Sequence, residues 1–110
     1  MKKTETKKND QIDNVLATLW EKNLPTLRER LDLLDRTASI AASGALPEAP
    51  RLEAYNIAHK LTGSLGMFGY QQGTDIARKI EHILKAPTPA QLTTLTTLAK
   101  DLRTSLAAGL

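Results

Sequence analysis

Apolar residues recur three and four positions apart along almost the whole of this 110-residue chain. This spacing matches the 3.6-residue period of an α-helix and places the apolar side chains on one face. The first such stretch contains Ile12, Val15, Leu16, Leu19 and Trp20. No segment alternates apolar and polar residues over a useful length, as a half-buried strand would. The pattern therefore predicts an all-α fold.

Proline and glycine interrupt this pattern and divide the chain into helices. Proline is tolerated in the first turn of a helix but breaks its interior, so we predict that a second helix begins at Pro25. Gly44 and Gly69 are natural C-terminal stops, and Thr88 with Pro89 is typical of a helix start. The helices are then expected from residue 12, over residues 25–44, 51–67 and 71–84, and from residue 89. Short loops between them indicate an antiparallel four-helix bundle core with an additional N-terminal helix.

The charge of the chain is concentrated at its N-terminus. Residues 1–9 hold four Lys and one Glu, whereas the remainder holds eleven basic and eleven acidic residues. We predict a disordered basic tail over residues 1–9 and one helical domain over residues 10–110. A neutral body with few aromatic residues does not favour nucleic-acid binding, and a nucleic-acid-binding bundle would depend on the tail alone.

The composition excludes several other classes of protein. The absence of cysteine excludes disulfides, thiolate zinc sites and thiol nucleophiles. No apolar run approaches the ~20 residues that cross a bilayer, and the basic N-terminus is not followed by the apolar region of a secretion signal. Gly-rich phosphate loops and nucleophile elbows are missing from the sequence. We therefore expect a cytoplasmic protein that neither spans nor binds a membrane and has no kinase or phosphatase activity of its own.

The predicted helix over residues 51–67 contains two glycines that its packing does not require. On a helical wheel, His59 lies about 140° from the apolar face, Gly63 about 180° and Gly66 about 120°. Each glycine inside a helix costs about 0.8–1.0 kcal/mol relative to alanine. Close packing of helices is one explanation. We favour another, in which the glycines let a partner approach the backbone beside an outward-facing His59.

Residues 58–69, AHKLTGSLGMFG, resemble the signature of histidine phosphotransfer (HPt) domains. That signature has an alanine before the histidine, an apolar residue two positions after it, glycines four and ten positions after it, and a small residue five positions after it. Trp20, Pro25 and Leu31 are similar to the family's junction between its first two helices. The resemblance covers roughly residues 11–106. It implies a helical bundle that carries a phosphoryl group between receiver domains in a two-component phosphorelay.

The resemblance implies a phosphoryl acceptor and a residue that orients it. His59 would accept the phosphoryl group on Nε2 from an aspartyl phosphate, and Glu81, 22 residues later, would accept a hydrogen bond from Nδ1–H. The partners would be receiver domains of response regulators or hybrid sensor kinases. The Mg²⁺ ion would belong to the receiver, so we expect no cofactor or metal in this chain, and we expect a monomer.

Further residues surround this predicted site. Lys60, Arg78 and Lys85 would stabilise the phosphoryl charge, although an ordinary pattern of surface charges explains them equally well. Gly63 and Gly66 would give access to the partner. Leu52 and Tyr55 would form an apolar rim on which a receiver docks, although a single exposed leucine carries little meaning by itself.

Thr62 departs from the family pattern, which usually has lysine three residues after the histidine. This difference leaves open a second function, in which the HPt fold serves as an adaptor that binds receiver or kinase domains without being phosphorylated. A metal site formed by His59, Glu81 and His82 is disfavoured, because adjacent residues on a helix point about 100° apart.

Overall fold

The computed structural model describes residues 2–110, with side chains from Asp13 onward. All regular structure in this part of the chain is helical, which confirms the all-α prediction. The helices are α1 (Lys2–Ala41), α2 (Glu48–Met67), α3 (Gln71–Lys85), the single turn α4 (Pro89–Leu92) and α5 (Leu95–Leu106). None of the helices in the described part is long and apolar enough to cross a bilayer.

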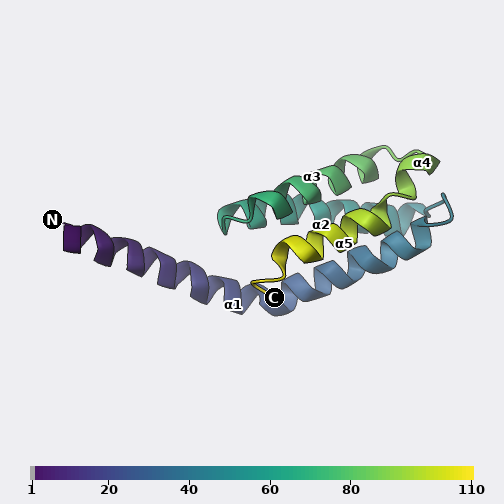
Figure 1. The fold of residues 1–110 in the computed structure, drawn as a ribbon. Helices are drawn as coiled ribbons and strands as arrows, with labels where there is room; N and C mark the ends of the chain where they lie inside the picture. The colour runs from purple at the N-terminus through teal and green to yellow at the C-terminus, as the bar shows by residue number, and fades with distance from the viewer. Residues whose placement is uncertain (1) are drawn as a thin grey trace.

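The second half of α1 packs with α2, α3 and α5 into a four-helix bundle (Figure 1). Each helix contacts two neighbours, in the order α1, α2, α3, α5 and back to α1, so the four helices enclose one core. The N-terminal part of α1 extends beyond the bundle, and the molecule measures 58 × 21 × 20 Å.

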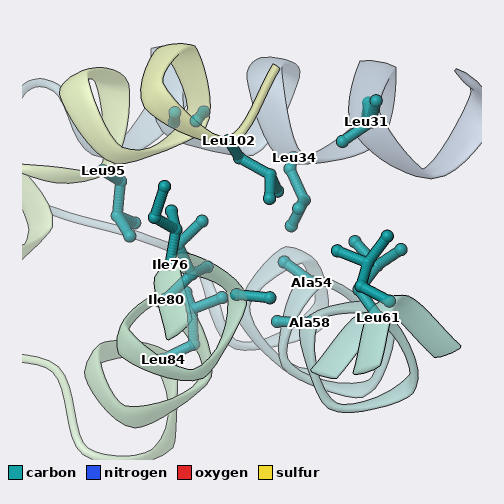
Figure 2. Packing of buried hydrophobic residues seen from close by; sticks show 14 of the residues in the cluster. Leu31, Leu34, Ala54, Ala58, Leu61, Ile76, Ile80, Leu84, Leu95 and Leu102 are labelled. Atoms are coloured by element: carbon teal, nitrogen blue, oxygen red, sulfur yellow. The ribbon is translucent and has the colours of Figure 1, made fainter. Parts of the chain in front are cut away.

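The core consists almost entirely of leucine, isoleucine and alanine side chains. Figure 2 shows that residues from all four helices point toward one another there, among them Leu34, Ala58, Ile80 and Leu102. Small alanines on α2 let the neighbouring helices approach closely, and the leucines fill the space between them. The apolar faces predicted from the helical spacing are buried in the bundle from Leu27 onward. The prediction is wrong for the first apolar stretch, where Val15 and Leu19 are 58% and 44% exposed.

The additional N-terminal helix is not confirmed as a separate element, because α1 continues through Pro25. Pro25 is exposed, so water can reach the carbonyl that loses its helical partner. Residues on both sides are anchored: Trp20 packs against Phe68 and Tyr70, and Leu27 lies in the core. This tertiary packing maintains the helix across the proline.

Figure 1 shows that α1 changes direction close to the last residues of the chain. The indole nitrogen of Trp20 donates to the Gly109 carbonyl at 2.8 Å, and Arg28 donates to the Leu110 carbonyl at 2.6 Å. These contacts place the bend in the stretch around Pro25, and a proline inside a helix is a common cause of a kink. The predicted disorder of residues 1–9 stays a prediction, because their side chains lie outside the described residues.

The predicted helix ends agree with the structure at most junctions. Gly44 follows α1 with a φ of 86°, and Gly69 follows α2 with a φ of 84°, a backbone conformation that favours glycine. The Thr88 side chain accepts from the backbone N–H of Gln91, with Pro89 in the first turn of α4. Two details differ: α2 begins three residues before Arg51, and the last predicted helix is divided into α4 and α5.

Candidate functional site on helices α2 and α3

Helices α2 and α3 lie side by side and run in opposite directions, because only a short loop joins them. Three contacts fix their register along this interface. Arg51 Nη1 donates to the Leu84 carbonyl at 2.7 Å, His59 contacts Glu81, and Gly66 lies against Thr74. The contacts advance along α2 as they go backward along α3. His59 is therefore paired with Glu81 by the packing of two whole helices.

The His59 imidazole contacts the Glu81 carboxylate, with Nδ1 2.7 Å from Oε2. The His59 side chain is 70% exposed, whereas the Glu81 side chain is only 19% exposed. A carboxylate accepts hydrogen bonds, so a neutral His59 in this contact carries its proton on Nδ1. The lone pair of Nε2 is then available to a partner at the exposed ring. The 70% exposure of the side chain confirms the prediction that His59 faces outward.

Thr62 also reaches Glu81, a contact that the sequence reasoning missed. Its hydroxyl lies 3.4 Å from Oε1 of Glu81 and 3.0 Å from the carbonyl oxygen of Ala58. The sequence carried a signal for this contact, since residues three apart on a helix share one side. Thr62 was treated only as a departure from the family pattern, and its distance from Glu81 depends on how α3 packs.

The two glycines of α2 have different surroundings. A Cβ atom built on Gly63 would meet nothing within 4 Å, so the surface one turn after His59 is open. A Cβ atom on Gly66 would lie 3.7 Å from Oγ1 of Thr74 on α3. Gly66 is exposed, as predicted, and this is an ordinary contact distance, so the packing of α2 on α3 leaves room for a methyl group there.

Among the described residues, the three predicted cations make no hydrogen bond or ion pair with His59 or Glu81. Lys60 and Lys85 are exposed, and neither makes an ion pair with another described residue. Arg78 donates to Asp75 at 3.3 Å and lines a groove of about 630 Å³. The other residues that line this groove are Asp75, Lys79, His82, Ile83 and Leu98. His82 thus borders a groove with Leu98 of α5, whereas the neighbouring Glu81 contacts α2.

The predicted apolar rim is only partly exposed. Leu52 projects to the surface on the first half of α2. Tyr55 is half-buried and packs against the core, so less of its ring is accessible to a partner. The exposed apolar part of the predicted rim is therefore mainly Leu52.

Arg51 is a further residue of this interface that the sequence reasoning missed. It forms a two-pronged ion pair with Glu48 in the same turn and donates to the Leu84 carbonyl in the last turn of α3. The last carbonyls of a helix lack partners within it, and Arg51 supplies one. The hydrogen bond from Arg51 lowers the pKa of Glu48, partly opposed by desolvation and aided by the guanidinium charge.

This arrangement suits nucleophilic chemistry at one exposed ring nitrogen. A carboxylate fixes the orientation of the imidazole and stabilises the positive charge that develops when Nε2 forms a bond. The His59 ring is exposed, so a reacting group can reach it from outside the bundle.

Comparison with protein families agrees with this geometry. The family model for the Hpt domain matches residues 16–108, which is nearly the whole chain. Comparisons with curated proteins and with solved structures gave no match. The matched segment contains the complete bundle, the outward-facing histidine and the glutamate that contacts it. The chain therefore belongs to the Hpt domain family, whose members are phosphotransfer modules of phosphorelays.

Proposed function

We propose that the protein carries a phosphoryl group on Nε2 of His59 and transfers it between aspartates of receiver domains. The observation that supports this most directly is the contact between His59 Nδ1 and Glu81 Oε2 at 2.7 Å. The rest of the His59 ring is exposed. In the neutral imidazole this contact puts the proton on Nδ1, and the Nε2 lone pair at the exposed side of the ring can then attack.

The transfer step follows from this geometry. The Nε2 lone pair attacks the phosphorus atom of an aspartyl phosphate, the N–P bond forms, and the bond from phosphorus to the carboxylate oxygen breaks. The aspartate leaves as a carboxylate. The ring keeps its Nδ1 proton and gains positive charge, which Glu81 offsets. Positioning and charge stabilisation are the main requirements of such a transfer.

The surrounding residues support docking of a receiver domain in this proposal. Gly63 leaves the surface next to His59 open, and exposed Leu52 offers an apolar contact. The exposed ammonium groups of Lys60 and Lys85, together with the guanidinium of Arg78, supply positive charge for a dianionic phosphoryl group. Exposed Gly66 and half-buried Tyr55 complete the surface on which the receiver docks.

Further parts of this proposal concern the protein as a whole. Mg²⁺ belongs to the receiver, and this chain is a phosphohistidine carrier without kinase or phosphatase activity. A monomer in the cytoplasm remains our expectation.

A second candidate function is a phosphorylation-independent adaptor that binds receiver or kinase domains. The observation that favours it is Thr62, which places a neutral hydroxyl where the family usually has a lysine. The two functions differ in one respect that can be measured, namely whether the partner interaction depends on phosphorylation of His59.

Phosphotransfer profiling tests the proposal. The chain is mixed with phosphorylated receiver domains, and acid-labile phosphate on the chain is measured. His59→Gln is expected to abolish labelling. His82→Gln is the matched control, because these are the two histidines of the chain, and it should label normally. Labelling that survives His59→Gln, or no labelling of the unmodified chain by any receiver of its host, would overturn the proposal. Receiver binding unaffected by His59→Gln would then support the adaptor.

A further inference from the structure

The two oxygens of the Glu81 carboxylate contact two different residues of α2. Oε2 lies 2.7 Å from His59 Nδ1, and Oε1 lies 3.4 Å from the Thr62 hydroxyl. His59 and Thr62 are three residues apart, so both side chains project from the same side of the helix toward α3. The carboxylate therefore has one contact at each oxygen.

The Thr62 hydroxyl has a single hydrogen and two acceptors within reach. The Ala58 carbonyl at 3.0 Å is the nearer one, but it is also the acceptor of the helical hydrogen bond from the Thr62 backbone. Oε1 of Glu81 is farther away and has no other partner among the described residues. The 3.4 Å distance is long for a hydrogen bond, but an ionised carboxylate attracts the hydroxyl hydrogen more strongly than a neutral carbonyl does, which favours donation to Glu81.

We propose that Thr62 is a positioning residue: its hydroxyl holds Oε1 of Glu81 so that Oε2 faces His59 Nδ1 and selects the Nδ1–H tautomer. This inference rests on the proposed function of His59. A hydroxyl donates its hydrogen without neutralising the carboxylate, so the negative charge remains available to the imidazole. Thr62 thereby contributes to the reactivity of Nε2 without touching the phosphoryl group.

The consequence is measurable on the unphosphorylated protein. Thr62→Val removes the hydroxyl at nearly constant shape and frees the carboxylate to rotate. Because one weak hydrogen bond is lost, the ratio of Nδ1–H to Nε2–H tautomer at His59 should fall about threefold. The ratio is read from ¹⁵N chemical shifts of the imidazole by NMR. Thr62→Ser keeps the hydroxyl and should restore the wild-type ratio.

Thr104→Val is the matched control. The Thr104 hydroxyl makes the same kind of contact with the carbonyl four residues earlier, Lys100 at 3.0 Å, on an exposed face of α5. This variant loses the local backbone bond alone and should leave the His59 tautomer ratio unchanged. The rate of labelling by phosphoramidate, a small phosphoryl donor, should fall in Thr62→Val and remain unchanged in Thr104→Val.

An unchanged tautomer ratio in a folded Thr62→Val protein would overturn the inference, as would an equal change in Thr104→Val. If Thr62→Val does not fold, the pair Thr62→Ala and Thr62→Ser tests the same hydroxyl. The tautomer measurement involves no phosphoryl transfer. Its failure is therefore distinct from failure of the proposed function, which the His59→Gln labelling experiment reports.

Discussion

Arg51 at the start of α2 donates a hydrogen bond to the carbonyl of Leu84 at the end of α3, with Nη1 2.7 Å from the carbonyl oxygen. The same guanidinium is held by Glu48 one turn earlier. This contact fixes one end of the interface between α2 and α3, and the contact between His59 and Glu81 lies farther along the same interface. The register of the site thus depends on a residue outside the site.

Replacing Arg51 by methionine should destabilise the bundle. The Leu84 carbonyl loses its donor, and a lost hydrogen bond of this kind costs about 1–3 kcal/mol. Urea unfolding followed by circular dichroism measures the difference. Arg36→Met is the control, because exposed Arg36 makes no ion pair with the described residues. Equal losses in the two variants would show that the Leu84 contact contributes nothing.

The ion pair between Glu48 and Arg51 should make part of the stability depend on pH. The pKa of Glu48 is lowered in the folded protein, chiefly by its hydrogen bond from Arg51. A lowered carboxyl pKa stabilises the fold above the unfolded pKa of about 4.5, and this contribution disappears as the pH falls through the folded value. Glu48→Gln should therefore be less stable than wild type at pH 7, and this difference in stability should be smaller at pH 3, measured by urea unfolding. If wild type and Glu48→Gln differ in unfolding free energy by the same amount at both pH values, ionisation of Glu48 is not the cause.

Replacement by alanine should change the stability of the protein in opposite directions at Gly63 and at Gly73. Gly63→Ala adds a methyl group where nothing lies within 4 Å, so helix propensity should stabilise the protein by about 0.8–1.0 kcal/mol. Gly73→Ala places a Cβ 3.0 Å from Cδ2 of buried Leu106, and this overpacking should cost about 1–3 kcal/mol. Thermal unfolding compares the two. If both variants shift the melting temperature in the same direction, the space around each glycine does not determine the effect of alanine on stability.

Trp20 should stabilise the end of the bundle through its indole N–H as well as its ring. It stacks on Tyr70 with ring centroids 4.7 Å apart and donates to the Gly109 carbonyl. Trp20→Phe keeps an aromatic ring but loses the hydrogen bond, so unfolding free energy should fall by about 1 kcal/mol. Trp20→Leu loses the stacking as well and should cost more. Equal stability of Trp20→Phe and wild type in urea would exclude a role for the indole N–H.

The charge and the hydrogen bond of Glu81 should contribute separately to phosphoryl transfer. Glu81→Ala removes both, and loss of a hydrogen bond to a charged group should slow transfer from a phosphorylated receiver roughly tenfold or more. Glu81→Gln keeps an acceptor oxygen without the charge and should be intermediate. Initial labelling rates measure this order, with the exposed Glu53→Ala on α2 as control. Transfer by Glu81→Ala at the wild-type rate would remove Glu81 from the mechanism.

The sequence predicted the central pair of the candidate site more accurately than its surroundings. His59 and Glu81 were identified from a resemblance and its 22-residue spacing, and the structure brings them into contact. Thr62 and Arg51 were missed as partners of α3, because their contacts cross between helices and depend on how α3 packs. The place of Gly66 beside Thr74 was missed for the same reason.

Helical periodicity by itself determined the all-α class and the apolar face of each helix, because the spacing of apolar residues is a local property of the chain. Packing decided which of these faces are buried, since Val15 and Leu19 of the first stretch remain exposed. The course of α1 through Pro25 was decided by tertiary packing, since Trp20 and Leu27 are anchored on either side and outweigh the local cost of the proline. The two contacts of the Glu81 carboxylate, with His59 and with Thr62, also exist only in the folded bundle. It requires two antiparallel helices in one register, and the free energy that fixes this register comes from contacts between residues far apart in the sequence.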